Sequence, residues 1–287
     1  MPAVSQANQH LLNISDHSRD SAGLRYIYPV ISRRAGGVSI GINLNVNNAC
    51  NWACIYCQVP NLTRGGPPPV DLVLLEKELR DFLHEAVDGD FMAQHVPLEA
   101  RRLADIAFSG NGEPTSAVEF PATVEMVGKV LAQFGLLEQL KIRLITNGSL
   151  LYRPEVREGI RRIGELDGEI WFKVDRATSD GIRQVNGVNL SVEAVRGSLE
   201  KCSALAPTWV QTCFFAIDGE PPSDAERAAY LSLIGTVQGR IQGVHLYGLA
   251  RPSLQPEAYR LSTVNPETLT AFAASIATLG VRVETSP

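Results

Sequence analysis

Three cysteines in one short stretch are the residues of this chain with the clearest capacity for chemistry. Cys50, Cys54 and Cys57 are separated by three and then two residues, so their thiols can converge from a single loop. Thiolates are soft ligands that bind zinc and iron–sulfur clusters. A structural zinc takes four protein ligands, and an ordinary iron–sulfur cluster takes four cysteines. This stretch supplies one ligand fewer, which leaves a coordination position open for a small molecule.

Two other uses of the cysteines are alternatives. A zinc site would need a fourth ligand, and the loop contains no histidine; the nearest is His84, inside a predicted helix. A redox or disulfide pair would use Cys54 and Cys57 and leave Cys50 without a role. A three-cysteine cluster with one open iron accounts for all three residues.

A second motif, Ser109-Gly110-Asn111-Gly112-Glu113-Pro114, follows a short apolar segment. Glycines let backbone carbonyls approach a ligand closely, and carbonyls are the acceptors that an ammonium group needs. Such a turn can therefore hold a polar ligand through its backbone, with Glu113 bracing the loop. A glycine-rich connection between a strand and a helix, without a ligand, is the alternative.

Further polar residues follow predicted strands. Thr146 and Asn147 can reach a ligand, or form a plain Asn-Gly turn with the next residue. Lys173 and Asp175 lie at another strand end, where a charge is either part of a site or simply at the surface. Arg251 carries a planar fork that fits a carboxylate or a phosphate.

The pattern of apolar residues predicts alternating strands and helices. We predict strands at 39–46, 105–109, 141–145, 169–174, 209–217 and 244–249, with a short final one at 281–284. Helices are predicted to begin at Val70 and to span 120–134, 153–163, 191–204, 224–233 and 266–279. This alternation indicates parallel βαβ units. In such folds the catalytic residues lie at the carboxyl ends of the strands. We therefore expect all the candidate residues to lie around one opening of the barrel, at that end of the sheet.

Composition indicates a globular chain with a sizeable core. Of the 287 residues, 45% are hydrophobic and 20% are charged, which is enough apolar material for a packed interior. Residues 1–24 are polar and aperiodic and are predicted to form a mobile N-terminal arm. Residues 25–287 show no linker or repeat and are predicted to form a single domain.

Charge and hydropathy limit the partners and the location. A net charge of −5 gives no global electrostatic reason to bind nucleic acid, although a local basic patch could still do so. We see no secretory signal and no apolar run of about 20 residues that would span a membrane. We therefore expect a cytoplasmic protein without a membrane partner. Cys202 and Cys213 lie in apolar segments and are predicted to act as small core hydrophobes.

The two motifs together resemble those of radical S-adenosylmethionine (radical SAM) enzymes. In that superfamily an aromatic residue, here Tyr56, usually precedes the third cysteine, and a GGEP element follows the second strand; here Asn111 stands between its glycines. The resemblance implies a [4Fe-4S] cluster on the three cysteines and S-adenosylmethionine at the open iron. It implies reductive cleavage to methionine and a 5′-deoxyadenosyl radical that takes a hydrogen atom from a substrate.

The same resemblance implies a fold, contacts and partners. The fold would be α/β, an open, partial (β/α)6 TIM-type barrel with outer helices. Ser109 to Glu113 would hold the methionine ammonium, and Lys173 and Asp175 would contact the ribose or the methionine carboxylate. Thr146, Asn147 and Arg251 would reach the cofactor or substrate. A reductant such as flavodoxin or ferredoxin would be a partner, and the substrate is not identified.

A narrower resemblance is to the wyosine-synthase-like group of radical SAM enzymes. It covers residues 25–255, including CNWACIYCQ, IAFSGNGEPT, LITNGSLL and LYGLARPS. That group carries a second cluster on additional cysteines, whereas here Cys202 and Cys213 are not spaced as cluster ligands. Because the cysteines for that second cluster are not matched, modification of a transfer RNA base is kept as an alternative function and not as the first one. A non-catalytic iron–sulfur binding or electron-transfer protein is a second alternative.

Overall fold

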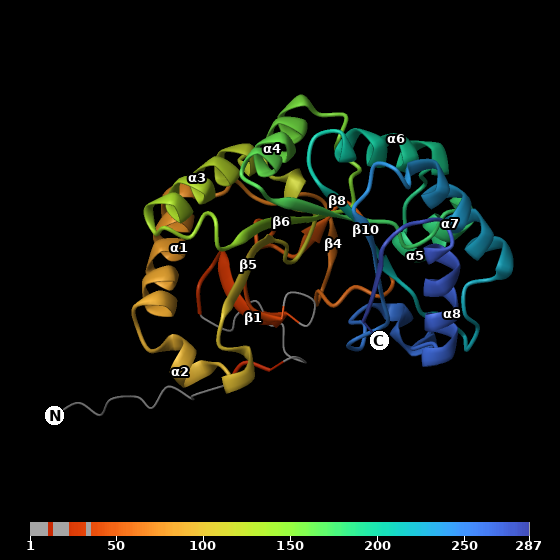
Figure 1. The fold of residues 1–287 in the computed structure, drawn as a ribbon, viewed down its shortest axis with the longest axis horizontal. Coiled ribbons are helices and arrows are strands. Elements are labelled where there is room, and N and C mark those ends of the chain that lie inside the picture. The colour runs from red at the N-terminus through yellow and green to blue at the C-terminus, as the bar shows by residue number, and fades with distance from the viewer. Residues whose placement is uncertain (1–10, 14–22, 33–35, 287) are drawn as a thin grey trace.

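A curled sheet of eight strands is the element around which the molecule is built (Figure 1). The computed structural model describes residues 11–13, 23–32 and 36–286. Across the sheet the strands follow the order β1-β2-β5-β6-β7-β8-β10-β12. Their bounds are β1 (Ile27–Ser32), β2 (Gly37–Ile42), β5 (Leu103–Phe108), β6 (Lys141–Thr146), β7 (Glu169–Lys173), β8 (Thr208–Cys213), β10 (Gly243–Tyr247) and β12 (Val283–Ser286). Every neighbouring pair is parallel except β1 and β2, which are antiparallel.

Helices lie around the outside of this sheet (Figure 1). They are α1 (Leu72–Val87), α2 (Phe91–His95), α3 (Phe120–Gln133), α4 (Pro154–Glu165), α5 (Ser179–Asn186), α6 (Val192–Ser203), α7 (Asp224–Val237) and α8 (Pro266–Ala277), with short 3₁₀ helices η1 (Leu98–Ala100), η2 (Pro114–Ser116) and η3 (Pro256–Arg260). Two pairs of two-residue strands complete the described elements: β3 (Ala49–Cys50) with β4 (Thr63–Arg64), and β9 (Ala216–Ile217) with β11 (Leu261–Ser262). No helix in the described ranges is long and apolar enough to cross a membrane.

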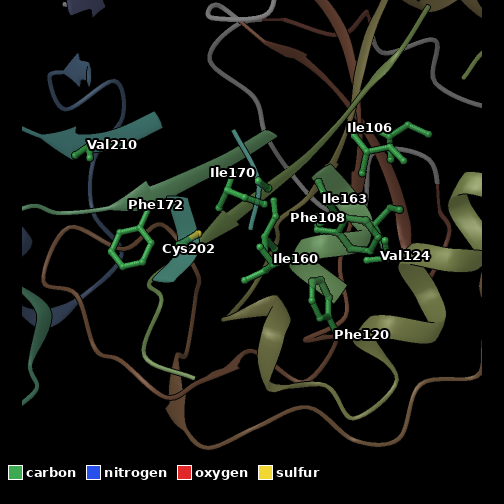
Figure 2. Close-up of a cluster of buried hydrophobic side chains, with 14 of the residues drawn as sticks. Ile106, Phe108, Phe120, Val124, Ile160, Ile163, Ile170, Phe172, Cys202 and Val210 are labelled. Carbon is green, nitrogen blue, oxygen red and sulfur yellow. The ribbon is translucent and has the colours of Figure 1, made fainter. Parts of the chain in front are cut away.

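The two-residue period of the strands gives the sheet an apolar outer face and a more polar inner face. Ile106 and Phe108 of β5 pack with Ile170 and Phe172 of β7 in the buried core that Figure 2 shows, and Cys202 of α6 joins them. Alternate positions of β5, β6, β7 and β8 line a cavity inside the curl: Asp105, Ala107, Arg143, Ile145, Trp171, Lys173, Gln211 and Cys213. Burial of each large apolar side chain contributes roughly 1.5–3 kcal/mol to the free energy of folding. The helices therefore pack on the apolar outer face, and the polar inner face remains available for a functional site.

The predicted fold class, an open partial barrel of parallel strands with outer helices, is confirmed. A strand lies at each position where the sequence predicts one, including the short strand near the C-terminus. β2 ends at Ile42 rather than at Val46, because the side chain of Asn43 accepts a hydrogen bond from the backbone of Asn45 at 3.1 Å and turns the chain. The strand predicted to reach Ile217 ends at Cys213, before the separate strand β9.

The edge strand β1 is absent from the sequence prediction. Pro29 suggests an interruption of the strand pattern, yet it lies within β1 and faces Ile40 across the pair. β1 is the first strand of the sheet, and among the strands that the structure describes it pairs with β2 alone. Proline is tolerated in edge strands because one side of such a strand needs no ladder hydrogen bonds.

Helix α5 is also absent from the prediction. Its sequence, SDGIRQVN, is short and polar and contains a glycine, which weakens the helical pattern. Its ends carry clear signals, however. The Thr178 hydroxyl accepts the N–H of Gly181 at 3.0 Å, and Gly187 ends the helix with φ of +66°. These two caps could have identified the helix.

The predicted division of the chain stays a prediction. The mobile arm was predicted for residues 1–24, which lie outside the described residues except at 11–13, 23 and 24. The single domain predicted for residues 25–287 corresponds to the part of the chain that contains the sheet and its helices.

Candidate functional site

The cysteine loop, residues 43–64, leaves the carboxyl end of β2. Its base is closed by the pairing of β3 with β4, and the side chain of Asn45 donates to the carbonyl of Ala49 at 2.9 Å. Cys50 belongs to β3, and Cys54 and Cys57 follow in a turn where the Cys57 N–H donates to the Cys54 carbonyl at 3.0 Å. The backbone therefore fixes the spacing of the thiols.

The three cysteines line one cavity of about 310 Å³, which the strand ends also line. Most of the other residues predicted for the site line it too: Tyr56, Ser109, Gly110, Asn111, Gly112, Glu113, Asn147, Lys173 and Arg251. Thr146 and Asp175 do not; both are buried, and they contact the lining residues from behind. One mouth thus collects residues from five separate segments of the sequence.

The three thiols are soft donors of the kind that bind iron–sulfur clusters. Burial raises the pKa of Cys50 to about 11 and that of Cys54 to about 12, so both are protonated at neutral pH until a cation displaces the protons. Within residues 11–13, 23–32 and 36–286, no three His, Cys, Asp or Glu side chains converge closely enough to hold one metal ion. In a cubane cluster each thiolate binds a different iron, so the three sulfurs need not meet at one point. The soft donor set and its spacing fit such a cluster.

The glycine-rich loop after β5 packs directly against the start of the cysteine loop. Gly110 has φ of +138°, and a side chain there would collide with Asn43. A side chain at Gly112 would collide with the carbonyl of Ala49. Glycine is therefore required at both positions by the packing of these two loops, in addition to any ligand.

Asn111, between these glycines, is held on both its backbone and its side chain. Its N–H donates to the Asn43 side-chain oxygen at 3.1 Å, and its own amide donates to the Asn48 side-chain oxygen at 2.7 Å. The residue that departs from the GGEP pattern thus ties the two loops together while it lines the cavity.

Glu113 is almost fully buried, with 3% of its surface exposed. Its carboxylate accepts hydrogen bonds from the Thr115 hydroxyl at 2.6 Å, the Thr146 hydroxyl at 2.6 Å and the Asn147 N–H at 2.7 Å. Burial raises the pKa of Glu113, although these donors oppose the shift. The carboxylate connects the loops after β5 and β6, and this explains the buried position of Thr146.

Asn147 connects the loop after β6 to the cysteine loop. Its side-chain amide donates to the Asn51 side-chain oxygen at 2.9 Å, and its oxygen accepts the N–H of Ser149 at 3.0 Å. The next residue, Gly148, has φ of +68°. The segment is therefore an Asn-Gly turn, and Asn147 lines the cavity as well.

Tyr56 and Asp175 form a buried contact beneath the cysteines. The Tyr56 hydroxyl donates to the Asp175 carboxylate at 2.6 Å, and the Lys173 ammonium lies 4.8 Å from the centre of the Tyr56 ring. Burial lowers the pKa of Lys173, but Tyr247 and Asp175 outweigh this effect and the net shift is upward. Lys173 therefore carries a positive charge inside the cavity.

The segment around Arg251 holds the far side of the cysteine loop. The Ser253 hydroxyl donates to the Ile55 carbonyl at 2.7 Å, and the Gln255 amide donates to the Val59 carbonyl at 2.8 Å. The Gln58 amide donates to the Arg251 carbonyl at 3.3 Å. Sequence reasoning singled out Arg251 and missed Ser253 and Gln255, because their contacts cross more than 190 residues of chain.

A charged group lower in the cavity was also missed. Arg143 of β6 forms ion pairs with Asp105 of β5 and, at 2.7 Å, with Glu169 of β7. The Trp171 indole donates to the same Glu169 carboxylate at 2.9 Å, and the Arg143 guanidinium lies 4.9 Å from the Trp171 ring. The alternation of Lys141 to Thr146 is the signal that could have placed Arg143 on the inner face.

The two remaining cysteines are buried, as expected. Cys202 is fully buried on the outer face of the sheet. Cys213 is 1% exposed and packs with Ile55, Tyr56 and Phe215. Unlike Cys202, it lies on the inner face of β8 and also lines the cavity.

Comparison with known proteins gives partial sequence matches and a fold match. No family model matches the chain. A UPF0026 protein of Methanocaldococcus jannaschii is 28% identical over 159 residues, which is 53% of this chain and 44% of that protein. A UPF0026 protein of Helicobacter pylori is 25% identical over 166 residues, which is 55% of this chain and 48% of that protein. The matches thus span less than half the length of these curated relatives.

A radical SAM methyltransferase from Sphaerobacter thermophilus has a similar structure. The TM-score is 0.58 at 16% identity, and the match covers 90% of this chain and 68% of the methyltransferase. A likeness at this level of identity establishes the fold. The resemblance to the wyosine-synthase-like group stays a prediction. The chain has the partial-barrel fold of radical SAM enzymes.

Proposed function

We propose that this chain is a radical SAM enzyme that binds a [4Fe-4S] cluster on Cys50, Cys54 and Cys57 and S-adenosylmethionine beside it. One observation carries the proposal. Three thiols from one loop line the same cavity as the glycine-rich loop of residues 109–114, at the carboxyl ends of parallel strands. The cysteines leave one iron open for a ligand, and the adjoining loop offers acceptors for an amine.

The bound group would supply the difficult chemistry, and the chain would orient it. When bound and reduced, a [4Fe-4S] cluster supplies one electron that cleaves S-adenosylmethionine to methionine and a 5′-deoxyadenosyl radical, which then takes a hydrogen atom from a substrate. The residues of this chain would bind the reactants, exclude water and hold the charges that this reaction requires.

The upper part of the cavity would hold S-adenosylmethionine. Backbone carbonyls of residues 109–113 would accept hydrogen bonds from its ammonium, and the glycines at 110 and 112 let this loop pack closely against the cysteine loop. Lys173 and Arg251 would meet its carboxylate with positive charge. The Asn147 side chain would form a hydrogen bond with a polar group of S-adenosylmethionine. Asp175 would act indirectly, by holding the Tyr56 hydroxyl.

The lower part of the cavity would take the substrate. Trp171 provides aromatic surface there, and Arg143 is held in place by two carboxylates. A reductant such as flavodoxin or ferredoxin would be the partner that supplies electrons.

Anaerobic reconstitution with iron and sulfide tests the proposal. We expect about four irons per chain and an electron paramagnetic resonance signal, after reduction by dithionite, that changes when S-adenosylmethionine is added. Changing Cys50, Cys54 and Cys57 together to alanine should abolish both. The matched control is Cys202→Ala, since this cysteine lies in the core away from the cavity. A cluster whose signal does not respond to S-adenosylmethionine would favour a non-catalytic iron–sulfur protein.

A further inference from the structure

Asn186 places a side-chain hydrogen-bond donor on the sulfur of Cys54. It is the last residue of α5 and is 1% exposed. Its amide nitrogen lies 3.3 Å from the Cys54 sulfur and 2.8 Å from an oxygen of Asp175. A carboxamide nitrogen carries two hydrogens, so these two contacts use both.

The backbone of the same helix turn holds the loop on either side of Cys54. The Ala53 N–H donates to the Asn186 carbonyl at 3.1 Å, and the Ile55 N–H donates to the Val185 carbonyl at 2.9 Å. The residues before and after the cysteine are therefore tied to the helix that carries the donor. The Asn186 amide and the Cys54 sulfur are held at a fixed separation.

The opposite end of α5 is anchored as well. The Thr178 hydroxyl caps the helix through the Gly181 N–H at 3.0 Å, and it donates to the carboxylate of Glu226 at 2.5 Å. The same carboxylate accepts the Thr178 N–H at 3.2 Å. Because Glu226 belongs to α7, the helix cannot slide away from the cysteine loop without breaking these contacts.

We propose that Asn186 is a positioning residue that raises the reduction potential of the cluster through its N–H···S hydrogen bond to Cys54. This inference rests on the proposed function, since it takes Cys54 as a cluster ligand. Hydrogen bonds to the sulfurs are among the factors that set the potential of an iron–sulfur cluster. Reduction adds negative charge to the cluster, and a donor on a ligand sulfur stabilises the more negative state. Asp175 orients the amide so that one hydrogen faces the sulfur.

A redox titration of the reconstituted protein tests this role. The variants are Asn186→Leu, which keeps the shape of the side chain without the donor, and Asn186→Ala. The matched control is Ser253→Ala, which removes an anchor of the same loop that bonds to carbonyls and to no cysteine sulfur. At the wild-type midpoint potential, the ratio of reduced to oxidised cluster should fall about fivefold in both Asn186 variants, as expected for the loss of one hydrogen bond. It should stay unchanged in Ser253→Ala.

Each outcome decides the inference. Potentials that are equal in wild type and both Asn186 variants overturn it, and so does an equal shift in Ser253→Ala, which would mean that loop anchoring sets the potential. Failure of both Asn186 variants to bind a cluster while Ser253→Ala binds one also overturns it, because the role assigned is tuning and not ligation. If wild type itself binds no cluster, the proposed function fails, and this result is distinct from the three above.

Discussion

The carboxylate of Glu113 accepts the main-chain N–H of Asn147 at 2.7 Å, and this bond joins the loop after β5 to the loop after β6. Both loops line the candidate site. A buried carboxylate with several backbone and hydroxyl donors acts here as a cross-link between segments that are 34 residues apart. The geometry of the site therefore depends on this carboxylate, which the sequence motif already suggests as a brace for the loop.

Replacing Glu113 with alanine should destabilise the fold. The hydroxyl of Thr146 and the N–H of Asn147 would lose a buried acceptor, and unsatisfied buried donors cost about 1–3 kcal/mol each. We expect the free energy of unfolding of the cluster-free protein to fall by about 3 kcal/mol, measured by urea denaturation. Glu119→Ala is the control, because Glu119 makes no side-chain capping bond at the start of α3. An unchanged urea midpoint in Glu113→Ala would show that the cross-link contributes nothing.

Replacing Arg143 with glutamine should also destabilise the protein strongly. Asp105 is almost fully buried, and loss of its cationic partner leaves an uncompensated charge, which costs about 3–5 kcal/mol. Arg161→Gln is the matched control: Arg161 also pairs with two carboxylates, Glu158 and Glu165, but on the exposed surface of α4. Its thermal midpoint should equal that of wild type. Similar midpoints for both variants would mean that the inner ion pairs are solvated like those on the surface.

Alanine at Gly110 should disrupt the contact between the glycine-rich loop and the cysteine loop. The new methyl group meets the Asn43 side chain, and the backbone conformation at φ of +138° is strained for any L-residue. We expect a loss of about 1–3 kcal/mol in stability and a weaker spectral response of the cluster to S-adenosylmethionine. Gly197→Ala in α6 is the control, since nothing lies within 4 Å of the added methyl group. It should be neutral or stabilising by up to about 1 kcal/mol. A Gly110→Ala protein with wild-type stability and response would contradict the packing argument.

The sequence predicts the parallel strands and most helices because each carries its own periodic pattern. The cysteines and the glycine-rich loop are recognisable for the same reason, since each motif is contiguous in the chain. The position of these motifs at strand ends follows from the parallel topology alone.

Contacts between distant segments account for what the sequence does not reveal. Asn186 meets Cys54 across 132 residues, and Ser253 meets Ile55 across 198. Neither residue lies in a motif, and their types are common in loops. β1 and α5 were missed because Pro29 and Gly181 weaken their local patterns, while the edge position of β1 and the caps of α5 make both elements possible.

Analysis of the products of S-adenosylmethionine tests the central claim most directly. The fully reconstituted protein would be incubated anaerobically with dithionite and S-adenosylmethionine, and the products would be separated by liquid chromatography with mass spectrometry. The account predicts equal amounts of methionine and 5′-deoxyadenosine from wild type and from Cys202→Ala, and neither product from the variant with alanine at Cys50, Cys54 and Cys57. Products from that variant at the wild-type level, or none from wild-type protein that holds its full complement of iron, would contradict it.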